Sequence, residues 1–259
     1  MQVLMRPWGA LHYRVDGPEE APAVVFANSL GTDLRLWDAV LPLLPRHRAI
    51  RFDKRGHGLS DRSGPHGVAD LAEDAAALIE AEAKGPVLFV GLSLGGCVGQ
   101  SLALTRPDLV RALVLSNTAA KMGTPESWRA RVEAIRKGGL ESIADPVMER
   151  WFAPAFRASA ALALWRNMLT RTDPEGYAAA CGALADFDLT ARLPALRPPT
   201  LVIAGSEDGA SPPDLVEATA RLVPGAVFRI IPGAGHLPCV ETPEAWASIL
   251  APFLTEHAR

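Results

Sequence analysis

A serine stands at the centre of the pattern Gly-Leu-Ser-Leu-Gly, which spans residues 91–95 with Ser93 in the middle. A short apolar run, residues 87–90, leads into this pattern, and a stretch compatible with a helix follows it. Where a buried strand turns sharply into a helix, flanking glycines let neighbouring backbone pass without clashing with a Cβ atom. The hydroxyl at the turn then projects above the carboxyl edge of the sheet, near helix N–H groups that favour negative charge. This arrangement suits a serine that acts as a nucleophile.

A nucleophilic serine needs a base, and the base needs an acid to orient it. Asp208 follows an apolar run that ends at residue 205, and His236 follows another that ends at residue 231. Both residues therefore fall at the same sheet edge as Ser93, and the chain order Ser, Asp, His is typical of this architecture. Glu207 competes with Asp208 for the role of the acid, but Asp208 fits the pattern better. The sequence thus predicts a catalytic triad of Ser93, His236 and Asp208.

The stretches that must position these residues alternate between strand and helix. Helical spacing of apolar residues occurs at 37–44, 68–79 and 243–254, and strand-like apolar or alternating runs occur at 10–15, 23–27, 49–53, 87–90, 110–116, 199–205 and 227–231. Strands separated by helices indicate βαβ units and a mostly parallel sheet. We therefore expect an α/β fold with a central sheet flanked by helices.

This alternation is interrupted once. Between about residues 121 and 196 the sequence is rich in Ala, Arg and Trp and is typical of helices only. We expect these helices to form a lid over the sheet edge. The predicted organisation is a first part of the core at 1–120, a helical lid at 121–196 and a second part of the core at 197–259.

Composition limits the classes of function. With 259 residues and 49% hydrophobic content, the chain is long enough for one large domain with a sizeable core. A net charge of −3 gives no electrostatic signature of nucleic-acid binding. No stretch approaches the ~20 apolar residues of a membrane helix. The three cysteines lie far apart without metal or disulfide spacing, so we expect small buried side chains and a cytoplasmic location.

The whole chain resembles the α/β-hydrolase superfamily. The resemblance is carried by Asp-Lys-Arg-Gly-His-Gly-Leu-Ser at 53–60, by the turn at Ser93, and by the loops of Asp208 and His236. Within the superfamily, the chain resembles 3-oxoadipate enol-lactonases through residues 26–33, 117–120 and 177–188. This resemblance implies hydrolysis of the lactone ester bond of a small-molecule substrate, 3-oxoadipate enol-lactone, in the catabolism of aromatic compounds. It implies no metal or organic cofactor.

One departure concerns the oxyanion hole. Many members of the superfamily carry His-Gly where this chain has Asn28-Ser29. By alignment to that motif, the two donors to the oxyanion are the backbone N–H groups of Leu30 and Leu94. Because the donors are backbone groups, the substitution of a glycine by Ser29 need not remove either of them.

A lactone of this kind carries a free carboxylate, which requires a cationic group in the pocket. The apolar strand ends supply none, whereas the predicted lid is rich in arginine, lysine and tryptophan. We expect a cation between residues 121 and 171 to bind the carboxylate, and the candidate substrate-binding residues are Trp128, Arg129, Arg131 and Trp151. For the tryptophans core packing is the default interpretation and lining of the pocket is the alternative, and for the arginines the default is a solvated helix face. Asn117, Lys121 and Met122 follow a strand end and are further candidates to line the pocket.

Other functions share these residues and stay open at this point. A carboxylesterase or a carbon–carbon bond hydrolase would keep the triad and differ in the lid. A metal-free haloperoxidase or perhydrolase would use Ser93 to form a peracid. A ligand-sensing relative would bind a small molecule without turnover. The sequence leaves the oligomeric state open. For His57, in the Arg-Gly-His-Gly turn, it favours a structural role over a catalytic one.

Overall fold

The computed structural model describes residues 1–258 and has an eight-stranded sheet at its centre, in the order β1-β2-β4-β3-β5-β6-β7-β8. The strands from β4 to β8 in this order run parallel, and a β1–β2 hairpin is joined to β4 in antiparallel orientation. This confirms the predicted α/β class. The strands are β1 (Gln2–Arg6), β2 (Gly9–Asp16), β3 (Ala23–Ala27), β4 (Arg48–Phe52), β5 (Val87–Leu92), β6 (Val110–Ser116), β7 (Thr200–Gly205) and β8 (Val227–Ile231).

The central strands have the continuous apolar sequences that burial on both faces requires. All six residues of β5 are buried, and so are all six residues of β7. The hairpin strand β1 was not predicted, because its side chains lie at the exposed sheet edge. Val3 and Met5 on β1 are 57% and 69% exposed, so no buried apolar run marks this strand in the sequence.

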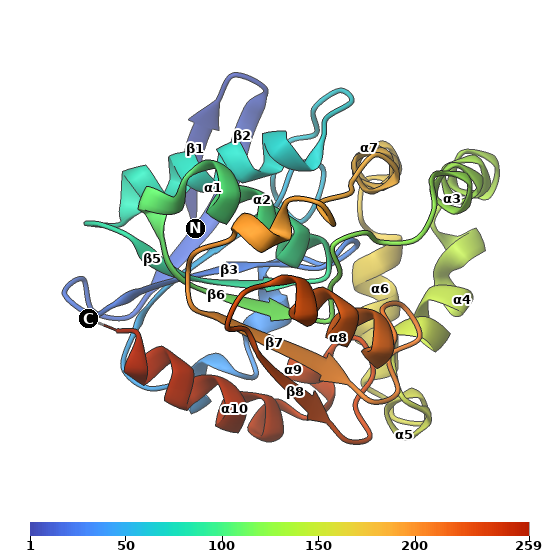
Figure 1. The fold of residues 1–259 in the computed structure, drawn as a ribbon. Helices are drawn as coiled ribbons and strands as arrows, with labels where there is room; N and C mark the ends of the chain where they lie inside the picture. Colours follow the sequence, from blue (N-terminus) through green and yellow to red (C-terminus); the bar gives the residue numbers. More distant parts are fainter. Residues whose placement is uncertain (259) are drawn as a thin grey trace.

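Helices cover both faces of the sheet. Figure 1 shows α1 and α2 along one face and α10 on the opposite face. The helices of the core are α1 (Val68–Glu82), α2 (Leu94–Thr105), α8 (Pro213–Leu222), α9 (Pro238–Glu241) and α10 (Pro243–Glu256). Two short 3-10 helices, η3 (Pro107–Leu109) and η4 (Leu193–Ala195), precede β6 and β7.

The predicted helix at 37–44 is wrong. This segment forms two short 3-10 helices, η1 (Leu34–Trp37) and η2 (Leu41–Leu43). Pro42 and Pro45 explain the difference, since proline lacks an N–H donor and its ring clashes with the preceding turn of an α-helix. Two residues of the apolar pattern, Trp37 and Val40, are buried, whereas Leu43 is 43% exposed. Trp37 is fully buried, with ring centroids 5.1 Å from Phe26 and 5.7 Å from Trp246.

Between β6 and β7 the described chain contains helices and no strand. We call residues 121–196 the helical region. Its α-helices are α3 (Pro125–Gly138), α4 (Glu141–Trp151), α5 (Pro154–Arg157), α6 (Leu162–Thr170) and α7 (Pro174–Ala185). They lie together on the side of the molecule toward which β6 and β7 point (Figure 1). This side is the carboxyl edge of the parallel strands.

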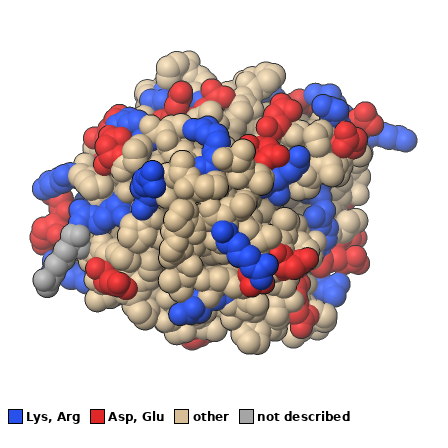
Figure 2. All heavy atoms as spheres, viewed as in Figure 1, with Lys and Arg blue, Asp and Glu red and all other residues tan. Residues whose placement is uncertain are grey.

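The distribution of surface charge and the burial of the cysteines are as expected from the composition. On the face drawn in Figure 2, basic and acidic side chains are interspersed over the surface. In the part of the chain that the structure describes, no helix is both long and apolar enough to cross a membrane. The three cysteines, Cys97, Cys181 and Cys239, are free and buried, as predicted.

Candidate active site

Ser93 lies at the turn between β5 and α2, as its sequence pattern predicts. Its backbone has φ 55° and ψ −117°, a conformation that costs on the order of 1–3 kcal/mol for a residue with a side chain. The turn is closely packed, because a Cβ atom on Gly91 would clash with the carbonyl of Gly95, and one on Gly95 would clash with that of Ala27. The N–H of Ser93 donates to the carbonyl of Ser116 at 2.9 Å. Glycine at both flanking positions therefore allows the strained turn to form.

His236 and Asp208 are in contact beyond the carboxyl ends of β8 and β7. Nδ1 of His236 is 2.8 Å from Oδ2 of Asp208, and both side chains are buried. Burial opposes ionisation of Asp208. The nearby His236 and the hydrogen bonds donated to the Asp208 carboxylate outweigh this effect and lower the pKa of Asp208. The ionised carboxylate accepts a hydrogen bond, so Nδ1 of His236 carries the proton. Nε2 of the same ring is then left with a lone pair that can accept one.

Asn117 supports this pair, which sequence reasoning did not anticipate. It follows β6 with a positive φ of 49°. Its Nδ2 donates to Oδ2 of Asp208 at 2.9 Å and to the carbonyl of Gly235 at 3.2 Å. The strand-end position of Asn117 was visible in the sequence, but its partners lie more than 90 residues away along the chain. Asn117 therefore contacts the Asp208–His236 pair. It is not among the residues that line the cavity.

A cavity of about 170 Å³ opens at this edge of the sheet. It brings together seven of the residues singled out from the sequence. These residues are Leu30, Ser93, Met122, Trp128, Arg131, Trp151 and His236. The rest of the lining is Ser29, Gly123, Ser127, Val147, Arg150, Tyr177, Leu184 and Ala210. Ser93 and His236 thus face one cavity together with side chains from α3, α4 and α7.

Besides Asn117, two of the sequence candidates lie elsewhere. Arg129 is exposed on α3 and is not among the residues that line the cavity. Lys121 is about half exposed and forms an ion pair with Asp188 at 3.1 Å. Arg150 lines the cavity but was not singled out, because nothing in the sequence distinguishes it from the other arginines of the helical region.

Two backbone N–H groups are available beside Ser93. Among the described residues, the N–H groups of Leu30 and Leu94 have no hydrogen-bond acceptor. Leu94 is the first residue of α2, where the helix dipole adds partial positive charge. Leu30 lies in the loop after β3 and lines the cavity. These two groups are suited to stabilise a negatively charged oxygen next to Ser93.

The cavity is cationic. Arg131 and Arg150 both line it, and the lining residues include no Asp or Glu. Arg150 is exposed as a residue, but partial burial of its guanidinium, followed by the positive charge of Arg131, lowers the pKa of that group. The guanidinium carbon of Arg131 lies 4.9 Å from the ring centroid of Trp128, a cation–π contact. An anion in the cavity would relieve the repulsion between the two arginines.

Within residues 1–258, no group of three or more His, Cys, Asp and Glu is arranged to hold a metal ion.

Comparison with known proteins defines the class. Residues 22–243 match the family model described as the alpha/beta hydrolase fold. The chain belongs to this family, which accounts for the sheet order and for the sharp turn at Ser93. The resemblance seen in the sequence is therefore confirmed at the level of the superfamily.

Individual relatives refine this picture. The chain is 33% identical over 241 residues to 3-oxoadipate enol-lactonase 2 of Acinetobacter baylyi. The aligned region covers 92% of this chain and 90% of that protein. The crystal structure of the enol-lactonase from Burkholderia xenovorans LB400 is 36% identical with a TM-score of 0.91, covering 95% and 96% of the two chains. A malate-bound thermophilic esterase from Thermogutta terrifontis is 31% identical with a TM-score of 0.92, covering 100% of both chains. The resemblance to enol-lactonases is confirmed, and an esterase is similar to a comparable degree.

Proposed function

We propose that this chain is a serine hydrolase that opens a small anionic lactone, with 3-oxoadipate enol-lactone as the substrate. The observation that carries the proposal is the composition of one cavity. Ser93 and His236 line it from the sheet edge, Arg131 and Arg150 line it from α3 and α4, and none of its lining residues is acidic. The similarity to enol-lactonases supports the same substrate.

In the first half of the reaction, Ser93 attacks the lactone carbonyl. Nε2 of His236 takes the proton from the Ser93 hydroxyl, while Asp208 keeps the proton of Nδ1 in place. The carbonyl oxygen becomes negative and is stabilised by the N–H groups of Leu30 and Leu94. When this intermediate collapses, the ring C–O bond breaks and an enolate leaves. His236 donates its proton to the enolate, and the acyl group stays on Ser93.

In the second half, water releases the acyl group. His236 takes a proton from the attacking water, and the same two N–H groups stabilise the second oxyanion. Collapse breaks the bond between the acyl carbon and Ser93, and His236 returns the proton to the serine oxygen. The products are the free enzyme and a keto acid, and one water is consumed.

Substrate selection belongs to the helical region in this proposal. A single guanidinium can hold a carboxylate through two parallel hydrogen bonds, and charge-assisted bonds are roughly twice as strong as neutral ones. Arg131 is half-buried, and its contact with the ring of Trp128 holds the guanidinium at the cavity. The helices α3 to α7 then act as a lid that carries the anion-binding group.

A carboxylesterase for small anionic esters is the second candidate. The malate-bound esterase from Thermogutta terrifontis supports it, since malate is a dicarboxylate and that protein is similar over its whole length. The same cavity would serve such a substrate, because the triad attacks an open ester by the same route as a lactone.

Steady-state turnover on three substrates tests the proposal. We expect kcat/KM for the enol-lactone to exceed that for both an open-chain ester acid and a neutral p-nitrophenyl ester. A higher value for the open ester acid would favour the carboxylesterase. Peracid formation from acetate and hydrogen peroxide as the dominant activity would favour a perhydrolase. Binding of the lactone without turnover would favour a ligand-sensing role.

A further inference from the structure

The loop that carries the Leu30 N–H, residues 28–33, is buried and held from several sides. We call it the Leu30 loop. At its start, Nδ2 of Asn28 donates to the carbonyl of Phe52 at 2.7 Å, and Nε1 of Trp37 donates to Oδ1 of Asn28 at 2.7 Å. At its end, the N–H of Leu34 donates to Oδ1 of Asp53 at 2.8 Å. The orientation of the Leu30 N–H is then decided by what holds the residues on either side of it.

Lys54 holds the carbonyl groups of the Leu30 loop. Its Nζ donates to the carbonyl of Ser29 at 2.6 Å and to that of Thr32 at 3.0 Å. The side chain is buried, and burial lowers the pKa of its amine to about 7, against the attraction of Asp53 and Asp33. A buried amine at this position is costly, and its two bonds both go to the Leu30 loop. One of them fixes the peptide unit that contains the Leu30 N–H.

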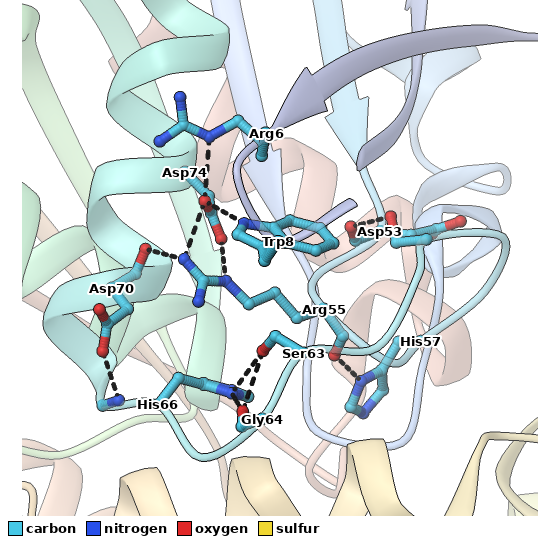
Figure 3. Close-up of polar contacts among 12 residues, drawn as sticks. Arg6, Trp8, Asp53, Arg55, His57, Ser63, Gly64, His66, Asp70 and Asp74 are labelled. Atoms are coloured by element: carbon cyan, nitrogen blue, oxygen red, sulfur yellow. Dashed lines mark hydrogen bonds and ion pairs between the residues drawn. The ribbon is translucent and has the colours of Figure 1, made fainter. Parts of the chain in front are cut away.

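His57 holds the other side of Leu30. The N–H of Gly31 donates to Nε2 of His57 at 3.1 Å. Because a backbone N–H is always the donor, Nε2 must carry the lone pair, and Nδ1 must carry the proton. Nδ1 accordingly donates to the carbonyl of Arg55 at 3.0 Å, a bond drawn in Figure 3. Burial, followed by the nearby Lys54, lowers the pKa of His57 well below its usual value, so the ring stays in the neutral form that accepts this bond.

The surroundings of His57 separate it from the neighbouring charge cluster. Figure 3 shows Arg6, Trp8 and Arg55 converging on Asp74, whereas the ring of His57 lies apart from them. Its ring stacks on Tyr177 with a centroid distance of 6.3 Å. His57 therefore connects the turn after β4 to the Leu30 loop and to a residue that lines the cavity.

We propose that His57 and Lys54 are positioning residues that hold the Leu30 N–H toward the oxyanion. Neither residue is among those lining the cavity, so both act through the loop and not on the substrate. The inference rests on the proposed function, because it concerns the oxyanion hole of that reaction. It gives the Lys-Arg-Gly-His stretch a role in the chemistry: its side chains set the geometry of the donor loop at the neighbouring strand end.

Two substitutions of His57 separate the two bonds of its ring. Glutamine places an amide oxygen near the position of Nε2, so His57→Gln keeps an acceptor for the Gly31 N–H. Asparagine is shorter and places its amide near Nδ1, so His57→Asn keeps only the donor to Arg55. The two variants each retain one bond and are matched in polarity. His66 lies in the same loop, and its ring contacts Ser63 and the carbonyl of Gly64 but not the Leu30 loop, so His66→Gln and His66→Asn are the controls.

The readouts are kcat, KM and affinity for a boronic acid that forms a tetrahedral adduct with Ser93. Rates are divided by the concentration of active sites, which is measured by labelling Ser93 with a fluorophosphonate. Loss of one donor costs about 10²–10³ in rate, and a misdirected donor costs part of that. We therefore expect His57→Asn to lower kcat about tenfold to hundredfold and to leave KM nearly unchanged. The affinity for the boronic acid should fall in parallel with kcat. We expect His57→Gln and both His66 variants to stay close to the wild type.

Lys54→Met provides an independent test, because it removes both bonds to the loop carbonyls while it keeps an unbranched side chain that is shorter by one atom. We expect the same pattern of lower kcat and weaker boronic acid binding. Equal activity and boronic acid affinity in His57→Asn and His57→Gln would overturn the assignment of His57. Wild-type values in Lys54→Met would overturn that of Lys54. In both cases the proposed function stands if Ser93→Ala is inactive. A wild-type protein that neither turns over nor binds the boronic acid would instead overturn the function itself.

Discussion

The sheet edge and the helical region present their functional groups in different ways. At the sheet edge, Asp208 accepts hydrogen bonds from His236, Asn117 and Ser211 within a buried network. In the helical region, Arg131 reaches the cavity from α3 with a cation–π contact to Trp128, and it forms no salt bridge with any described residue. Groups that transfer protons need fixed distances, whereas a group that selects an anion needs free charge. The predictions below probe this division, beginning with the largest expected effect.

Replacing Ser93 by alanine should remove nearly all activity on every substrate. Triad enzymes lose about 10⁶ in kcat when the nucleophile is removed. The unfolding free energy should change little, since a small hydroxyl is lost at a turn. Steady-state kinetics on the enol-lactone and on a neutral ester give the first value, and urea unfolding gives the second. Activity within about tenfold of the wild type, a barrier change of about 1.4 kcal/mol, would exclude Ser93 as the nucleophile.

Replacing Asp208 by asparagine should lower kcat by about 10⁴, because the histidine loses the correct tautomer. The loss should be the same for charged and neutral substrates, since both need the proton transfer. Glu207 is exposed and adjacent, so Glu207→Gln is the matched control and should keep the wild-type rate. If Glu207→Gln were the more damaging of the two, the acid would lie one residue earlier than proposed.

Replacing Arg131 by alanine should raise KM for the anionic lactone by about tenfold or more, which corresponds to about 1.4 kcal/mol of binding. Hydrolysis of a neutral ester should be nearly unchanged. Arg129, two residues earlier and exposed, supplies the control, and Arg129→Ala should behave as the wild type on both substrates. Equal losses on charged and neutral substrates would mean that Arg131 does not bind a carboxylate. Arg150→Ala would then be the next variant to measure.

The smallest effect concerns the connection between the two regions. Oε1 of Glu241 accepts the N–H of Gly235 beside His236, and Oε2 accepts the N–H of Ala153, each at 2.8 Å. Burial, opposed by these two bonds, raises the pKa of Glu241 from its ordinary 4.5 to about 7. The folded state therefore binds more protons than the unfolded state between these values, and stability falls as the pH rises through this window.

Glu241→Gln should reduce this pH dependence by about 1 kcal/mol, after allowance for solvent screening of a partly exposed group. Urea unfolding at pH 5, 6, 7 and 8 measures it. Glu244 is exposed at the start of α10, so Glu244→Gln should leave the dependence unchanged. A wild-type pH profile in Glu241→Gln would show that Glu241 does not titrate in this range.

The sequence predicted the sheet edge better than the helical region, for physical reasons. A strand–turn–helix needs glycine where backbone passes close by, so Gly91 and Gly95 mark the position of Ser93. Parallel strands end at one edge, so Asp208 and His236 could be placed there from apolar runs alone. Close packing and strand polarity both leave local signals in a sequence.

The helical region leaves weaker signals, because a helix shows which residues share a face but not what that face meets. Arg129 and Arg131 were equal candidates, and the packing of α3 turns Arg131 to the cavity and leaves Arg129 exposed. The bond from Asn117 to Asp208 and that from Gly31 to His57 join residues distant in the chain. Such contacts are set by tertiary structure, and single-sequence patterns do not contain them.

One measurement tests the division between bond cleavage and anion selection most directly. It is the ratio of kcat/KM for the enol-lactone to kcat/KM for a neutral ester, determined for the wild type, Asp208→Asn and Arg131→Ala. We expect Asp208→Asn to lower both values by about 10⁴ and to leave the ratio unchanged. We expect Arg131→Ala to lower the ratio by about tenfold or more. A ratio that falls equally in both variants, or that stays constant in Arg131→Ala, would contradict the account.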